Sequence, residues 1–229
     1  MLISVNGIEI NYERSGQGHP LILLHCNSHD HTFFNDLVKR LGNKFTVYAL
    51  DSRCHGKSSV TPVLTYEDMA EDVACFINEL KLEKPFLCGS SDGGNIGLIL
   101  ASKYPDILSK LVVCGACTSV SGNKPSMVKF IRLFHSIMCK SKNPKQIVQA
   151  KKFELMLNQR EITKADLQKI TVPTLVLAGS KDSILNSHTC DMASHIQNHS
   201  LIILNGEGHV SYIKKSKKLC EVMLPFLEK

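Results

Sequence analysis

The sequence predicts an α/β protein with a mostly parallel, twisted sheet and helices on both of its faces. Six apolar runs rich in β-branched residues recur along the 229 residues, and stretches with helical patterns separate them. Each run ends in polar or small residues at its C-terminal side. Since the carboxyl ends of parallel strands meet at one edge of a sheet, we expect a functional site along that edge.

The first element is predicted to be an antiparallel hairpin. Leu2–Val5 and Ile8–Arg14 are joined across Asn6-Gly7, a dipeptide typical of a two-residue hairpin turn. The buried strands are then expected at Pro20–Cys26, Phe45–Asp51, Pro85–Gly89, Leu111–Gly115, Thr174–Gly179 and Leu201–Gly206.

Helices are expected between and after these strands. Tyr66–Leu80 and the C-terminal segment Ser211–Glu228 carry apolar residues at near-helical spacing. Gly94–Lys103 follows a glycine-rich turn and precedes the fourth buried run. The run of lysines at 214–218 is predicted to be a solvated first turn of the last helix, not a nucleic-acid contact.

Residues 118–169 break the alternation of strands and helices, because they contain helical, lysine-rich stretches and no buried-strand run. These stretches are Ser126–Cys139, Asn143–Leu157 and Thr163–Lys169. The sequence therefore predicts a core formed by residues 1–117 and 170–229, with residues 118–169 inserted as a helical cap.

The formal net charge of +6 is concentrated in this insertion, which holds eleven Lys or Arg and three acidic residues. One interpretation is a basic rim that attracts an anionic substrate, such as a carboxylate-bearing ester or a thioester. The other is a cap whose lysines simply face water. We favour the second, because no glycine-rich phosphate loop accompanies the lysines.

Composition excludes several classes of protein. Apolar residues make up 43% of the chain and charged residues 21%, which is typical of a soluble globular protein. No segment reaches the roughly 18 to 20 apolar residues that a membrane span needs, and no signal-peptide pattern is present. The nine cysteines are odd in number and scattered, which favours reduced thiols. We therefore expect a cytoplasmic protein that acts on a small molecule, without a nucleic-acid or membrane partner. Oligomeric state stays open.

Metal and cofactor sites are not predicted. His25, His29 and His31 lie close together in the sequence, but no carboxylate pattern accompanies them, so we expect neither a metal nor a cofactor.

The stretch FLCGSSDGGN places two serines in a glycine-rich turn between a strand and a helix. A nucleophilic serine exposed at such a turn needs residues without side chains two positions before and after it. Gly89 and Gly93 flank Ser91 in this way, whereas Cys88 and Asp92 would flank Ser90. Ser91 is therefore the candidate nucleophile.

A serine hydroxyl is a poor nucleophile unless a histidine takes its proton and a carboxylate orients that histidine. Asp182 follows the run Thr174–Gly179, and His209 lies in a glycine-flanked loop after the last run. Asp191 is a rival for the carboxylate; it lies further into the next helix. The rivals of the histidine, His195 and His199, precede the last run and would sit at the wrong edge of the sheet.

The order Ser91, Asp182, His209 and the segments around these residues resemble the α/β-hydrolase fold. The chain is most similar to its small-cap serine hydrolases, such as carboxylesterases and enol-lactone hydrolases. The resemblance covers almost the whole chain. The segments that carry it are LILLHCNSHDHTFF, LDSRCHGKSS, CGSSDGGNIGLILA, PTLVLAGSKDSI and GEGHVSYI.

The resemblance implies an oxyanion hole formed by the backbone N–H groups of Asn27 and Asp92. It further implies cleavage of an ester-type bond, in a carboxylic ester, thioester or lactone, through an acyl-enzyme on Ser91. Two alternatives stay open. One is a carbon–carbon bond hydrolase or lyase that uses the same triad, and the other is a ligand-binding protein without turnover.

Cys26 and Cys54 depart from the family pattern, because glycine is usual at both positions. If Cys26 must take a conformation that only glycine adopts freely, its Cβ would cost on the order of 1 to 2 kcal/mol and would shift the oxyanion loop.

Overall fold

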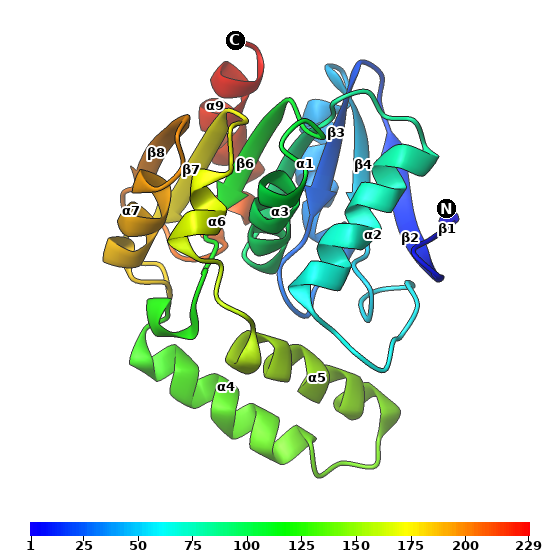
Figure 1. Cartoon of the computed structure of the whole chain (residues 1–229), viewed down its shortest axis with the longest axis vertical. Coiled ribbons are helices and arrows are strands. Elements are labelled where there is room, and N and C mark those ends of the chain that lie inside the picture. The colour runs from blue at the N-terminus through cyan, green and yellow to red at the C-terminus, as the bar shows by residue number, and fades with distance from the viewer.

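A computed structural model describes all residues from 1 to 229 and shows one eight-stranded sheet between two layers of helices (Figure 1). The strands are β1 (Leu2–Val5), β2 (Ile8–Ser15), β3 (His19–Leu24), β4 (Phe45–Leu50), β5 (Phe86–Ser90), β6 (Lys110–Cys114), β7 (Thr174–Gly179) and β8 (His199–Leu204). Their order is β1-β2-β4-β3-β5-β6-β7-β8. The pairs β1·β2 and β2·β4 are antiparallel and all others are parallel, so the predicted fold class is confirmed.

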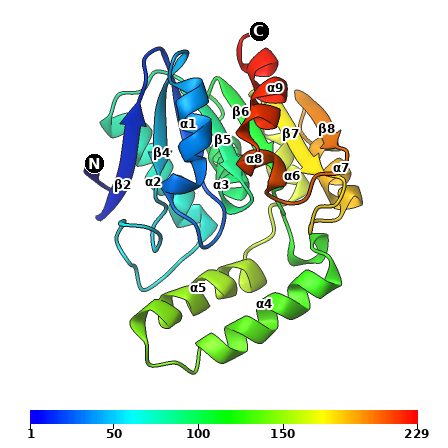
Figure 2. The same cartoon turned by 180° about the vertical axis from the view of Figure 1, so that it is seen from behind.

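Helices cover both faces of the sheet (Figures 1 and 2). One face carries α2 (Tyr66–Glu79), α3 (Asp92–Lys103), α6 (Lys164–Gln168) and α7 (Asn186–Ser194), and the other carries α1 (Asn35–Leu41), α8 (Ser211–Lys214) and α9 (Ser216–Leu227). Each face of the sheet has its own hydrophobic core. Side chains along β3 point alternately to the two faces, so Ile22 and Leu24 enter the first core while Leu21 and Leu23 enter the second. A strand that is buried on both faces therefore has a continuous apolar sequence.

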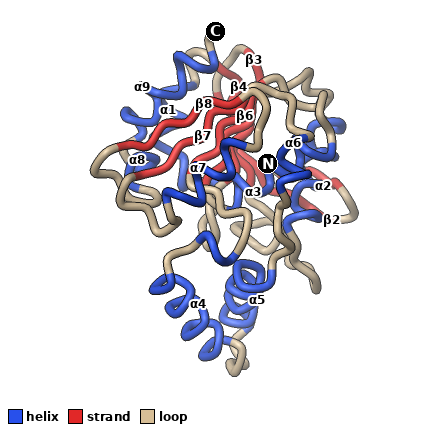
Figure 3. Tube along the Cα trace, turned by 60° about the vertical axis from the view of Figure 1, so that its left-hand side comes forward, coloured by secondary structure: helices blue, strands red, loops and turns tan.

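The helices α4 (Pro125–Met138) and α5 (Pro144–Asn158) pack against each other as a hairpin, joined to the rest of the fold by loops and by the short 3₁₀ helix η2 (Val120–Gly122). All three views place this hairpin at one end of the molecule, away from the sheet (Figures 1, 2 and 3). Each helix begins with proline, whose fixed φ suits the first helical turn. The third helix of the predicted cap, α6, packs instead against α3 of the core.

The C-terminal helix is not continuous, in contrast to the prediction for Ser211–Glu228. The helix is interrupted at Lys215, where φ is −84° and ψ is 64°, so α8 and α9 are separate helices. Packing decides this break, because α8 buries Tyr212 against the sheet while Ser216 accepts a 2.7 Å hydrogen bond from Arg40 Nε. Helical periodicity alone does not reveal such a change of direction.

The lysine run in this region faces solvent, as predicted, with Lys214, Lys215 and Lys217 exposed. Lys215 Nζ and Lys218 Nζ lie 3.3 and 3.0 Å from Oε1 of Glu207. These contacts tie the start of α9 to the loop after β8.

Helix α1 was not predicted, because its seven residues are too few for a clear apolar period. No helix combines the length and apolar character that crossing a bilayer would require.

Candidate active site

Ser91 lies at a strained turn between β5 and α3, with φ of 52° and ψ of −110°. The flanking glycines permit this turn. A Cβ on Gly89 would stand 2.1 Å from the backbone oxygen of Gly93, and one on Gly93 would stand 2.1 Å from that of Leu24. Ser90 is buried, and its hydroxyl contacts no hydrogen-bond partner. Of the two serines, only Ser91 lines the cavity described below.

The structure brings Ser91, His209 and Asp182 into one hydrogen-bonded chain. Nε2 of His209 lies 3.0 Å from Oγ of Ser91, and Nδ1 lies 2.7 Å from Oδ1 of Asp182. A carboxylate only accepts hydrogen bonds, so Nδ1 carries the ring proton and Nε2 is free to accept the proton of the serine. Gly115, with φ of 60°, leaves room for the imidazole, since a Cβ there would lie 3.1 Å from the ring.

Asp182 follows β7 directly and is almost completely buried. Burial disfavours its charge, but the hydrogen bond from His209, the charge of that ring and the 2.9 Å hydrogen bond from the Ile184 amide outweigh it. The pKa of Asp182 is therefore lowered. An ionised Asp182 can hold the imidazole in the Nδ1–H form.

The rival residues lie elsewhere. Asp191 is on α7, where it is exposed and pairs with Lys164 at 3.6 Å. His195 ends the same helix, and His199 begins β8 at the opposite edge of the sheet from His209.

The backbone N–H groups of Asn27 and Asp92 donate to no acceptor within the protein, which leaves both free for a ligand atom. The side chains of the two residues are joined, because Asn27 Nδ2 donates to Asp92 Oδ2 at 2.8 Å and to the Lys152 carbonyl at 3.1 Å. Asp92 is also the first residue of α3, whose N-terminal dipole favours negative charge nearby.

Tyr66 is a second partner of Asp92 that no sequence pattern indicates, and its hydroxyl donates to Oδ1 at 2.7 Å. Both side chains are buried. Burial raises the pKa of the Asp92 carboxyl, against the hydrogen bonds from Tyr66 and Asn27 that favour its ionised form. Tyr66 is the first residue of α2, and only the packing of α2 on α3 brings it to the site.

The two cysteines at usual glycine positions behave differently from each other. Cys26 does not adopt a positive φ, so the strain considered for it does not arise. Cys54 does, with φ of 62°, and so does Ser28 in the loop after Asn27. Burial raises the pKa of the Cys26 thiol to about 12, so this thiol stays protonated and unreactive.

A cavity of about 550 Å³ opens above Ser91 and His209. Its floor is polar and comes from the strand ends, whereas its far wall comes from the cap hairpin. The apolar side chains of that wall are Met127, Phe130, Ile131, Phe134, Met138, Phe153 and Met156. The site thus combines a hydrogen-bonded serine with a mainly apolar chamber.

The histidines considered as metal ligands do not form one group. His25 is buried; its Nδ1 lies 2.8 Å from the Cys26 carbonyl oxygen and its Nε2 accepts from the Ser52 amide, while His29 contacts the thiol of Cys26. Burial lowers the pKa of His25 to about 4, which keeps the ring neutral. Its neighbour His55 is buried too, and its pKa is lowered to about 3.

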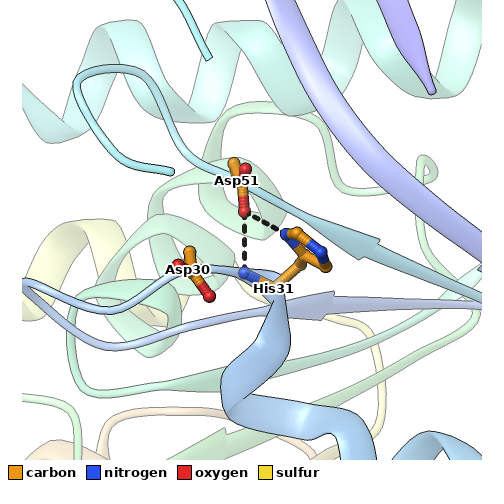
Figure 4. Close-up of side chains that lie close together, drawn as sticks. All are labelled: Asp30, His31 and Asp51. Atoms are coloured by element: carbon orange, nitrogen blue, oxygen red, sulfur yellow. Dashed lines mark hydrogen bonds and ion pairs between the residues drawn. The ribbon is translucent and has the colours of Figure 1, made fainter. Parts of the chain in front are cut away.

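His31 belongs to a different cluster, with Asp30 and Asp51 (Figure 4). Oδ1 of Asp51 contacts both the backbone amide and Nδ1 of His31 at 2.7 Å, and its Oδ2 accepts from Asn11 Nδ2 and the Lys57 amide at 2.8 Å. Asp30 caps the short helix η1 (His31–Phe34). Because both oxygens of Asp51 already accept two hydrogen bonds, this cluster fixes a loop and offers no ready ion site.

Comparison with known proteins agrees with this geometry. The sequence profile described as alpha/beta hydrolase fold matches residues 19–135, just over half of the chain. The human protein named serine hydrolase BPHL is 27% identical, with 97% of this chain and 85% of the human protein aligned.

Solved structures give the same fold over the full length. A thermophilic esterase from Thermogutta terrifontis superposes with a TM-score of 0.84 at 24% identity, covering 100% of this chain and 97% of its own. The enol-lactonase from Burkholderia xenovorans LB400 gives 0.83 at 20% identity, with both chains covered completely. At these identities the likeness supports a shared fold alone.

Proposed function

The chain belongs to the alpha/beta hydrolase fold family, and from that premise we propose that it is a serine hydrolase that cleaves an ester-type bond through an acyl-enzyme on Ser91. The observation that carries the proposal is the chain of hydrogen bonds from Ser91 through His209 to Asp182 at the floor of the cavity. A buried carboxylate, an imidazole hydrogen-bonded to it and a serine at a strained turn are the groups that acyl transfer requires.

In the proposed first step, Oγ of Ser91 attacks the substrate carbonyl carbon while its proton passes to Nε2 of His209. The 3.0 Å distance is within hydrogen-bond reach, so no rearrangement precedes the transfer. Asp182 stabilises the resulting imidazolium. His209 then protonates the leaving group, and water, deprotonated by the same ring, releases the acyl group.

The tetrahedral intermediate carries a negative oxygen, and the amides of Asn27 and Asp92 are the proposed donors to it. Both N–H groups lack a protein acceptor, and the side-chain hydrogen bond between these two residues holds their backbones in a fixed relation. One such donor contributes about 3 kcal/mol to catalysis in acyl-transfer enzymes.

The apolar cap wall favours a substrate with an apolar acyl or alcohol part. In this proposal the predicted cap, residues 118–169, closes the chamber through the α4–α5 hairpin, whereas its third helix, α6, packs on the core. Of the basic residues in 118–169 only Lys152 is buried. Charge selection for an anionic substrate has no further support, since none of the eleven Lys or Arg lines the cavity.

The test is intact-mass labelling with a fluorophosphonate, in which the serine oxygen bonds to phosphorus, fluoride leaves and His209 takes the proton. We expect one adduct on the wild-type protein and none on Ser91→Ala. Ser90→Ala is the matched control, because it removes the adjacent hydroxyl, and it should label like the wild type.

An activity assay follows the labelling experiment. Hydrolysis of p-nitrophenyl esters of increasing acyl length should rise until the chain fills the 550 Å³ cavity, and Ser91→Ala should lower kcat/KM by roughly 10⁴-fold or more. A well-folded wild type that takes no label would refute the proposal and favour a ligand-binding role. Labelling without turnover of any ester, thioester or lactone would favour another bond, such as carbon–carbon.

A further inference from the structure

Helix α4 exposes a stripe of large apolar side chains that no part of the chain covers. Phe130, Leu133 and Ile137 are 50, 58 and 59% exposed. At 100° per residue they fall within about 60° of one another on the helix surface. Ile147 on the neighbouring α5 is also exposed, at 41%. Large apolar side chains gathered on one surface mark an interaction site.

This stripe continues into the cavity. The ring of Phe130 packs on that of Phe134 with 4.4 Å between centroids, and both side chains also line the chamber above Ser91. Around α4 the exposed stripe and the cavity wall are therefore adjacent sectors of one apolar surface. A long apolar molecule lying on the outside of α4 would be next to the cavity mouth.

The segment that carries the stripe is basic, and the first acidic residue after it along the chain is Glu154, in the later part of α5. Residues 118–153 contain eight Lys or Arg and no acidic residue. Lys129, Lys140, Lys142 and Lys145 are exposed on α4, on the tip of the hairpin and at the start of α5. No salt bridge engages any of these four ammonium groups.

We propose that the outer face of α4 and the tip of the α4–α5 hairpin, defined by Phe130, Leu133, Ile137 and the lysines around them, dock on an anionic lipid surface. The apolar side chains would enter the headgroup region, and the lysines would face the lipid phosphates. Apolar residues beside a lysine-rich face are the combination that binds helices in the plane of an anionic membrane. The hairpin lies at one end of the molecule, so it reaches a flat surface before the core does (Figure 3).

Charge argues against a second copy of this chain as the occupant. A self-interface on this face would bring two surfaces of the same sign together, which is unfavourable. An anionic surface instead neutralises the lysines. This inference revises the absence of a membrane partner expected from the sequence, and it does not depend on the proposed hydrolase activity.

The test is co-sedimentation of the Ser91→Ala protein, which spares the lipid, with vesicles of phosphatidylglycerol or of phosphatidylcholine. We expect the protein to bind phosphatidylglycerol vesicles and not phosphatidylcholine vesicles. Added salt should weaken the binding to phosphatidylglycerol. Leu133→Gln/Ile137→Gln should lower the partition coefficient about tenfold. Neither residue lines the cavity, so with Ser91 intact the same pair should leave ester turnover unchanged.

Two controls make the result specific. Leu2→Gln/Val63→Gln changes equally exposed apolar residues, at 58 and 62%, outside the cap and should bind like the parent. Replacing lysines 129, 140 and 142 with glutamine should weaken binding about fivefold per residue, and it tests the surface even if the apolar pair fails to fold. Equal binding by parent and variants, equal binding to both lipids, or a vesicle-free dimer that the apolar pair dissociates would overturn the proposal.

Discussion

Lowering the pH from 7 to 5 should destabilise this fold through two buried histidines, His25 and His55. Burial lowers the pKa of His25 to about 4 and that of His55 to about 3, and their rings lie 4.9 Å apart. In the unfolded chain both have pKa values of about 6.5. Between these values the unfolded state binds protons and the folded state does not, so the free energy of unfolding falls as the pH falls.

The size of this effect follows from the pH interval between the unfolded and folded pKa values. Each buried histidine lowers the free energy of unfolding by about 1.4 kcal/mol per pH unit below its unfolded pKa, until its folded pKa is reached. From pH 6.5 to 5 this is about 2 kcal/mol for each ring and about 4 kcal/mol for the pair. A total stability of about 5 to 15 kcal/mol is usual for a domain, so such a loss is large.

The assay is urea unfolding followed by circular dichroism at several pH values between 7 and 5. His55→Gln removes one titrating ring. Between pH 7 and 5 the free energy of unfolding of this variant should fall by about 2 kcal/mol, compared with about 4 kcal/mol for the wild type, whatever the variant's stability at pH 7. Carboxyl groups contribute equally to both proteins and cancel in the comparison. His199→Gln, at an exposed position, should behave like the wild type. If His55→Gln kept the full pH dependence, the assignment of acid sensitivity to this buried pair would be wrong.

Three further predictions concern the site and the core. Gly93→Ala should destabilise the protein by about 2 to 4 kcal/mol in thermal unfolding, because its Cβ would lie 2.1 Å from a backbone oxygen, whereas Gly208→Ala, with nothing closer than 3.9 Å, should not; equal melting temperatures would contradict this. Asn27→Ala should lower kcat roughly 10-fold or more with little change in melting temperature, because without its side-chain hydrogen bond to Asp92 the backbone amide proposed to bind the oxyanion is no longer held in place; an unchanged kcat would remove that role. Asp72→Asn should cost about 3 kcal/mol in urea unfolding, because it removes the buried charge that accepts two 2.6 Å hydrogen bonds from Arg53 and leaves this guanidinium only the partly exposed Asp68, 3.5 Å away, as a counter-ion; a loss under 1 kcal/mol would contradict it.

Local residue patterns were enough to predict the sheet and the turn at Ser91. Strands such as β3 and β7 are buried on both faces, so their apolar runs are continuous and easy to recognise. The choice of Ser91 over Ser90 depended only on the glycines two positions away, and the structure shows the backbone contacts that exclude a Cβ there. These features depend on residues adjacent in the chain, so the sequence carries them directly.

Other features depend on segments that are distant in the chain. The break at Lys215, the contact of Tyr66 with Asp92 and the attachment of α6 to the core arise from how helices pack on the sheet. Whether Cys26 must take a glycine-like conformation was left open for the same reason, and the loop carries its positive φ at Ser28.

The amino-acid pattern was enough for the fold class, the position of the turn at Ser91 and the preference for Asp182 over Asp191. Packing in three dimensions was needed to show that Ser91, His209 and Asp182 lie within hydrogen-bond distance, and that one side of α4 lines a cavity while another is exposed. The physical reason is that periodicity shows which side of a helix is apolar, whereas its neighbours in space decide whether that side is covered.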